Sequence, residues 1–161
     1  MAAMRRRART VPQDLCRPST SITARTNLPG ECPGPGAIGW KDDDDFDRRR
    51  FLSHLRDSVD RCGWVVHAFC LMTTHYHVVL QSTTVELSRG VQRLNGRYAQ
   101  SFNRRHLRFG QLFADRFTSK VIEEERYLRH ACQYVVENPV RAGICDSAEA
   151  WPWARSRYEA G

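Results

Sequence analysis

The sequence predicts an α+β fold in which helices cover a single antiparallel sheet. Two short apolar segments, 64–72 and 75–81, have the length of strands and lie two residues apart, which favours an antiparallel pair. Longer segments repeat their apolar residues at helical spacing. With further strands expected at 21–26 and 113–122, the order is strand, helix, strand, strand, helix, strand, helix.

Composition indicates one globular domain with a polyanionic partner. The 161 residues are 41% hydrophobic and 27% charged, and 25 Lys and Arg outweigh 18 Asp and Glu, for a net charge of +7. Only Lys41 and Lys120 are lysines. The planar guanidinium of arginine suits phosphate contacts and base stacking, so the bias favours nucleic acid. A GC-rich gene would also enrich arginine.

The cysteines and the absence of a long apolar run point to the cytoplasm. Six cysteines show no C-x-x-C spacing, and no hydrophobic signal core follows the basic residues 5–9. We therefore expect reduced thiols, a cytoplasmic protein and no membrane span.

Residues 1–40 differ from the rest of the chain. They are rich in proline and glycine with almost no apolar periodicity, so we expect a poorly ordered N-terminal segment. Residues 21–26 alone alternate β-branched side chains and form a candidate strand. The ordered domain is expected to span 41–158.

The first helix should begin in the acidic run 42–45, whose carboxylates suit a helix N-terminus better than a metal site. Leu52, Leu55, Val59 and Cys62 follow at helical spacing, and Gly63 is expected to end the helix.

The segment 75–81 begins with two histidines one residue apart. Alternate residues of a strand share a face, so His75 and His77 present both imidazoles on one side, and Tyr76 packs on the other. Two imidazoles on one rigid strand supply half of a divalent-metal site. Paired histidines are also common as plain polar positions on a half-buried strand.

The second helix, 85–106, is expected to carry basic side chains along one face. Arg89, Arg93 and Arg97 recur four residues apart, and no acidic residue lies between Leu87 and Ala114. We expect this stripe to line a DNA path. Further cations expected there follow the helix or lie on the strand 113–122: Arg104, Arg105, Arg108, Arg116 and Lys120. Arg104, Arg105 and Arg108 could instead only solvate a loop.

The third helix should begin at the acidic residues 123–125 and end before Pro139, whose ring disfavours further helix. The tail 151–158 is expected to pack its aromatic side chains onto the sheet. His130, Tyr134 and Asn138 recur every four residues and share a face. A tyrosine beside a metal can be a nucleophile, and an amide oxygen suits Mg²⁺ or Mn²⁺. Alternatively, Tyr134 lies only at the margin of a packed helix.

These residues together resemble a known family. The triplet 75–77 is similar to the His-hydrophobic-His motif of HUH single-tyrosine transposases, the IS200-like family. The stretch 127–143, with its Tyr134 and Asn138-Pro139, resembles the corresponding helix of REP-associated tyrosine transposases. Supporting blocks lie at 47–52, 87–98 and 151–153, so the resemblance covers about 42–158.

The resemblance implies a ferredoxin-like HUH domain that acts on single-stranded or hairpin DNA. Tyr134 would be the nucleophile, and His75, His77 and Asn138 would hold Mg²⁺ or Mn²⁺. Transesterification would link the DNA 5′ phosphate to the phenol, and a 3′-OH would later rejoin the strands. No membrane or small-molecule substrate is expected, and the chain would act as a monomer or homodimer.

Several alternatives stay open. The family's early Tyr-His strand and the Arg-Gly-Asn after it have no clear match in residues 13–40, which puts the sheet edge and the activity in doubt. The rival is a catalytically impaired remnant that still binds DNA hairpins. A single-stranded RNA module has weaker support. At the metal, Cys70 would indicate zinc, and Glu137 competes with Asn138 as the oxygen ligand.

Overall fold

The computed structural model describes residues 19–25, 45–82 and 87–158 and has the predicted α+β fold. In chain order its elements are β1 (Ser19–Arg25), α1 (Asp45–Cys62), β2 (Trp64–Leu71), β3 (His75–Ser82), α2 (Leu87–Arg105), β4 (Thr118–Ile122), α3 (Glu125–Arg141), the 3₁₀ turn η1 (Ala148–Ala150) and β5 (Ala154–Ser156).

The strands form one antiparallel sheet in the order β4-β1-β3-β2-β5. β1 therefore lies in the interior, paired with β3 on one side and β4 on the other. The expectation that sequence divergence before residue 40 falls at the sheet edge was wrong, because β4 and β5 form the edges. Local periodicity identified the strand but carried no information about its partners.

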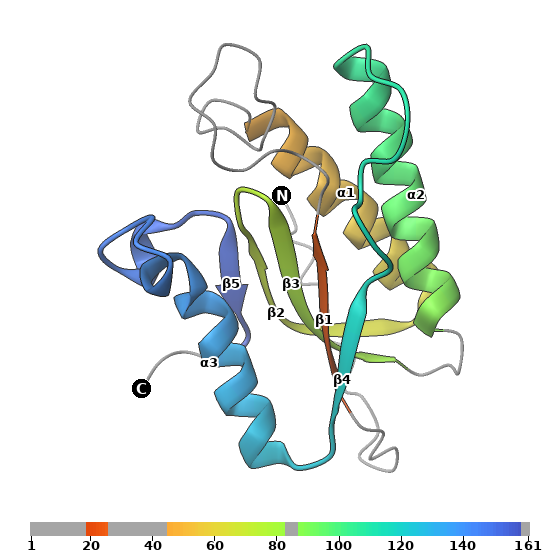
Figure 1. Cartoon of the computed structure of the whole chain (residues 1–161). Coiled ribbons are helices and arrows are strands. Elements are labelled where there is room, and N and C mark those ends of the chain that lie inside the picture. The colour runs from red at the N-terminus through yellow and green to blue at the C-terminus, as the bar shows by residue number, and fades with distance from the viewer. Residues whose placement is uncertain (1–18, 26–44, 83–86, 159–161) are drawn as a thin grey trace, which may run out of the picture.

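Helices cover both faces of the sheet (Figure 1). α1 and α2 contact each other on one face, while α3 lies on the other and contacts β2, β3 and β5. Tyr76 of β3 identifies the face of α1 and α2. Its ring centroid lies 4.6 Å from that of Phe51, and its hydroxyl donates to Asn95 Oδ1 at 2.7 Å.

The larger core lies between the sheet and the α1–α2 pair. Phe51, Tyr76 and Tyr98 are fully buried, and the Phe51 ring contacts both tyrosine rings. α2 approaches β2 so closely that a Cβ added to Gly90 would lie 2.4 Å from Trp64 Cζ2. α1 ends at Cys62 as predicted, and Gly63 adopts the left-handed backbone with φ 62°.

Two predicted boundaries were wrong. β4 begins at Thr118 instead of 113, because Leu112 is buried and Phe113 lies 6.3 Å from both the Tyr76 and Tyr98 rings. A segment that inserts two consecutive side chains into the core cannot keep the alternation of a strand.

α3 runs through Pro139 to Arg141 instead of ending before it. Proline lacks one amide hydrogen, but the following turn keeps its bonds: the amides of Ala142 and Ile144 donate to the carbonyls of Asn138 and Pro139, each at 2.9 Å. The ring of Pro139 is also buried, which offsets the lost hydrogen bond so close to the helix end.

The C-terminal aromatic side chains pack onto the domain as expected. Trp151 and Trp153 are both 9% exposed, and the buried guanidinium of Arg48 lies 5.2 and 5.5 Å from their ring centroids. Trp151 Nε1 donates to the carbonyl of Leu71 at 3.0 Å. Across the described ranges, no helix is both long and apolar enough to cross a membrane.

Candidate active site

His75 and His77 begin β3 and point away from α1 and α2, opposite to Tyr76. Their ring centroids are 4.9 Å apart with an interplanar angle of 87°, and both residues are half-buried. The Thr74 hydroxyl lies 3.2 Å from His75 Nδ1. This contact fixes the His75 ring and directs Nε2 away from the turn.

The strand register shows which other residues share the face of the histidines. Cross-strand partners point to the same side of a sheet, and Val79 shares the face of His75 and His77 because it lies two residues after His77. The row of partners runs from Val79 through Ser21 to Lys120. Lys120 is therefore a cation on the histidine face, two strands from β3.

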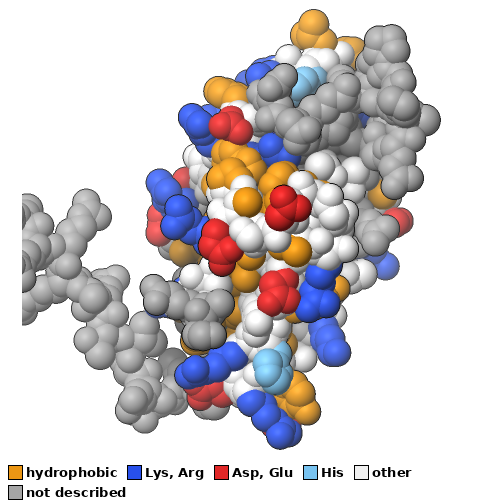
Figure 2. Space-filling view, turned by 90° about the vertical axis from the view of Figure 1, so that its left-hand side faces the viewer, with side chains coloured by type: hydrophobic (Ala, Val, Ile, Leu, Met, Phe, Trp, Pro, Cys, Tyr) orange, Lys and Arg blue, Asp and Glu red, His pale blue; other side chains and the backbone are white. Residues whose placement is uncertain are grey.

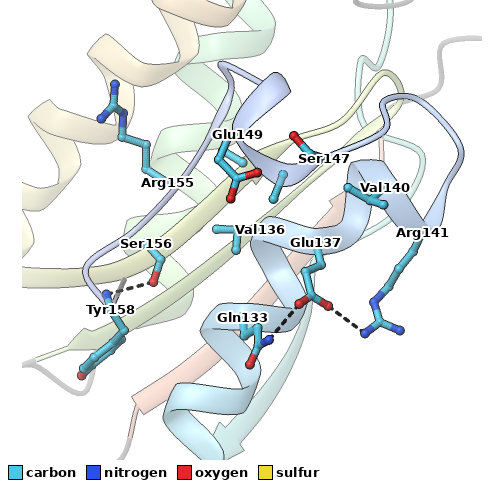
Figure 3. Close-up of a pocket in the computed structure, with 12 residues that line it drawn as sticks. Gln133, Val136, Glu137, Val140, Arg141, Ser147, Glu149, Arg155, Ser156 and Tyr158 are labelled. Atoms are coloured by element: carbon cyan, nitrogen blue, oxygen red, sulfur yellow. Dashed lines mark hydrogen bonds and ion pairs between the residues drawn. The ribbon is translucent and has the colours of Figure 1, made fainter. Parts of the chain in front are cut away.

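α3 covers part of the same face. Its buried side chains, Leu128, Cys132, Val135 and Pro139, form the stripe that packs on the sheet. One flank of this stripe faces β5 and η1 across a pocket of about 550 Å³ (Figure 3). The pocket is lined by Gln133, Val136, Glu137, Val140 and Arg141 from α3.

Tyr134 and Asn138 lie on the opposite flank of α3. At about 100° per residue, Tyr134 and Asn138 fall on the side of the buried stripe opposite to the pocket residues. They therefore lie away from β5 and toward β3. α3 also contacts β3 directly. The flank that carries Tyr134 and Asn138 is thus the one turned toward the strand of His75 and His77.

Tyr134 is 52% exposed, so its phenol is accessible from solvent. Asn138 Nδ2 donates to the Tyr134 carbonyl oxygen at 2.9 Å, so the amide oxygen Oδ1 is not used in this bond. The guanidinium of Arg141 lies 5.3 Å from the Tyr134 ring centroid. Sequence reasoning missed Arg141, although its place seven residues after Tyr134 on one helix signals a shared face.

Glu137 is held on the flank that faces β5. Its Oε1 accepts from Gln133 Nε2 at 2.8 Å and its Oε2 from Arg141 Nη2 at 2.9 Å (Figure 3). The hydrogen bond from Arg141, supported by that from Gln133, lowers the pKa of Glu137. Both carboxylate oxygens are therefore engaged away from the histidines.

The donor set suits an open site better than a closed one. No three His, Cys, Asp or Glu side chains gather for a metal anywhere in the described ranges. Burial raises the pKa of the Cys70 thiol to about 12, which disfavours the thiolate that zinc requires. Two imidazoles and one amide oxygen would leave positions for oxygens of a substrate.

The arginine stripe lies on the other layer of the molecule. Arg89, Arg93 and Arg97 are exposed on α2, which covers the Tyr76 face of the sheet. Contrary to the sequence prediction, the stripe is also not purely basic, because the carboxylate of Asp57 in α1 lies 3.8 Å from the guanidinium of Arg97. The sequence of α2 alone does not show which acidic residues of other elements lie beside it.

The remaining predicted cations have different surroundings. Arg105 pairs with the buried carboxylate of Asp47 at 2.9 Å, so it stabilises the α1–α2 contact. Arg104 and Arg116 are exposed, and Arg108 is half-buried. On the face that carries α3, Lys and Arg side chains lie mainly around the margins and acidic ones nearer the centre (Figure 2).

Comparisons with known proteins agree with this architecture. The family described as "Transposase IS200 like" matches residues 43–138, more than half of the chain. A REP-associated tyrosine transposase solved in complex with a REP hairpin has 13% sequence identity and a TM-score of 0.68, over 96% of this chain and 82% of that one.

A second solved structure, a putative transposase from Deinococcus radiodurans R1, has 17% identity and a TM-score of 0.48 over 84% of this chain and 97% of that one. No curated protein shows significant sequence similarity to the chain. The match of the family over 43–138, which includes both histidines, Tyr134 and Asn138, shows that the chain belongs to the IS200-like transposase family.

Proposed function

We propose that this chain nicks and rejoins single-stranded DNA through a covalent 5′-phosphotyrosine at Tyr134. One observation carries the proposal: His75 and His77 point to the face of the sheet that α3 covers, and the α3 flank turned toward β3 bears Tyr134 and Asn138. A tyrosine that faces a metal held by two imidazoles can carry out phosphodiester transesterification, because the metal activates the phosphate for attack by the phenol.

His75, His77 and Asn138 would hold a divalent cation, Mg²⁺ or Mn²⁺. Asn138 is preferred over Glu137 because Oδ1 is not used in the bond to Tyr134, whereas both Glu137 oxygens accept hydrogen bonds on the other flank. When bound, such a cation would polarise the scissile phosphate and so favour attack by the phenol.

The chain's own residues would perform the covalent step. The Tyr134 phenol gives up its proton to solvent as its oxygen forms a bond to phosphorus, the bond from phosphorus to the 3′ oxygen breaks, and the released 3′ oxygen takes up a proton from solvent. A 3′-OH later attacks the phosphotyrosine and releases the phenol, so no external energy is required. Arg141 lies over the Tyr134 ring and pairs with Glu137 through Nη2, and its guanidinium has further donors for a phosphate oxygen.

For the DNA, we propose a path along the histidine face past Lys120, with Arg116 beside β4. Arg89, Arg93 and Arg97 would contact only DNA that extends around the molecule onto α2. The structural neighbour was solved with a REP hairpin, which makes a hairpin with a single-stranded extension the first substrate to test.

The rival function is DNA binding without cleavage. It was motivated by the diverged sequence before residue 40, which suggested a damaged sheet. β1 nevertheless pairs with β3 along its whole length and with β4 over residues 19–23, so the strand beside the histidines is in place. The active enzyme is therefore the better supported reading.

The test is covalent capture. The chain, Mn²⁺ and a hairpin oligonucleotide should give a DNA adduct that survives denaturing electrophoresis. Tyr134→Phe should abolish it, whereas Tyr127→Phe, on the same helix and equally exposed, should retain it. An adduct in Tyr134→Phe would refute the nucleophile, and metal-dependent binding without any adduct in the parent chain would favour the rival.

A further inference from the structure

The turn between α2 and β4 exposes two large apolar side chains. Leu107 is 85% exposed and Phe109 is 97% exposed, more than any other large hydrophobic residue of the described ranges. The turn lies at the end of α2 (Figure 1). An isolated exposed leucine needs no explanation, but a nearly bare phenylalanine beside it marks a contact surface.

The turn is held in this conformation by its own backbone. The amides of His106 and Arg108 donate to the carbonyls of Phe102 and Asn103 at 2.9 and 2.8 Å, and Asn103 Nδ2 donates to the Gly110 carbonyl at 2.8 Å. Leu107 has a φ of 50°, which is costly for a leucine and persists only where the surroundings impose it. The apolar side chains are thus fixed outward.

The surroundings of these two side chains are basic. Arg104 is exposed one turn before Leu107, and the guanidinium of Arg105 lies 4.6 Å from the Phe46 ring centroid. The acid that pairs with Arg105 and His106, Asp47, has a side chain only 3% exposed. An exposed aromatic side chain surrounded by cations suits a partner that is negatively charged and has flat apolar faces. Nucleic acid has both properties, whereas a second copy of this basic chain would repel the first.

The turn lies at the same end of the molecule as the histidines. His106 contacts Asp47 at the start of α1, and the next residue, Arg48, lies against Trp151. Trp151 in turn donates to the Leu71 carbonyl, and the amide of Met72 donates to the carbonyl of His75. Consecutive contacts therefore connect the turn to the first histidine.

We propose that the 106–110 turn is a DNA-contacting tip on which Phe109 stacks against an exposed base, with Leu107 packed beside it. The inference rests on the proposed action on DNA and adds the element that receives a base. Stacking of one base on one aromatic ring contributes enough to change DNA affinity by at least several-fold. Because Phe109 carries no charge, its loss should leave the salt dependence of binding unchanged.

The experiment measures binding of a labelled hairpin with a single-stranded extension by fluorescence anisotropy at several salt concentrations. Phe109→Ala should weaken binding about tenfold with an unaltered salt slope. Phe109→Trp should restore the affinity, whereas Phe109→Leu should not, because only an aromatic ring stacks. Val121→Ala removes an exposed apolar side chain from β4, on the side opposite to Lys120, and should bind like the parent chain.

Formation of the covalent DNA adduct at saturating DNA separates this inference from the proposed function. Phe109→Ala should still form the adduct at saturating DNA. A parent chain that binds hairpins but forms no adduct would refute the proposed cleavage reaction and leave the proposed base contact standing.

The proposal that Phe109 stacks on a base would be overturned by any of three results. These are DNA affinity equal to that of the parent chain in Phe109→Ala, full affinity in Phe109→Leu, or no hairpin binding by the parent chain. A change in oligomeric state of Phe109→Ala with DNA affinity retained would also overturn it, since the surface would then join two copies.

Discussion

The side-chain Nδ2 of Asn138 donates a hydrogen bond to the carbonyl oxygen of Tyr134, at 2.9 Å. The bond spans one helical turn and ties the proposed ligand to the proposed nucleophile. It also fixes the amide, because the nitrogen is committed to the helix, and the oxygen takes no part in this bond.

Asn138→Ala should therefore weaken Mn²⁺ binding by about tenfold or more, since even residues that only orient a ligand change metal affinity by that amount. Glu137→Gln should leave the affinity nearly unchanged, because Glu137 is held by Gln133 and Arg141. Titration of each variant with Mn²⁺, followed by electron paramagnetic resonance, measures both. The reverse pattern would transfer the ligand role to Glu137.

Lys120→Ala should reduce the slope of log affinity against log salt by about one, because each phosphate contact releases condensed counterions. Arg97→Ala should change the slope less, since Asp57 already lies 3.8 Å from Arg97 and α2 covers the other face. Hairpin binding at four or more salt concentrations tests the pair. Equal losses would mean that the DNA also contacts α2.

Gly90→Ala should lower the free energy of unfolding by about 1–3 kcal/mol, because the added methyl group would overlap Trp64. Gly96→Ala offers a matched control in the same helix, where a Cβ meets nothing within 4 Å. It should raise the free energy of unfolding by about 0.5–1 kcal/mol through helix propensity. Urea unfolding of both variants checks the packing of α2 on β2.

Stability should fall as pH decreases below about 6.5, partly because of His67. Burial, followed by the charge of Arg157, lowers the pKa of this histidine below its usual value. The unfolded chain then binds more protons in the window just below the unfolded pKa, so acid favours unfolding there. Urea unfolding at several pH values should show a shallower dependence on pH in His67→Gln than in the parent chain. The same slope in His67→Gln and the parent chain would rule out His67 as a source.

Sequence patterns predicted the parts of the fold that depend on local spacing. Helical periodicity and Gly63 gave the end of α1, and alternation placed His75 and His77 opposite Tyr76. Contacts between distant segments were not predictable in this way. The interior position of β1 depends on its pairing with β3 and β4, and no local pattern encodes those partners.

The same distinction applies to the candidate site. The spacing of Tyr134 and Asn138 predicted their common face, but only the pocket beside β5 shows which flank of α3 turns toward β3. The expected end of α3 before Pro139 failed because burial of the ring offsets one lost hydrogen bond. The sequence of α2 does not reveal the acidic neighbour of Arg97, because Asp57 lies forty residues earlier in the chain.

The central claim, that Tyr134 is the covalent nucleophile, is tested most directly by mapping the DNA adduct. The chain is incubated with Mn²⁺ and a hairpin oligonucleotide, trimmed with nuclease and protease, and analysed by tandem mass spectrometry. We predict a 5′-phosphonucleotide on the peptide that contains Tyr134 and none on that containing Tyr127. A modification on any other residue, or cleaved DNA with no modified peptide, would contradict the account.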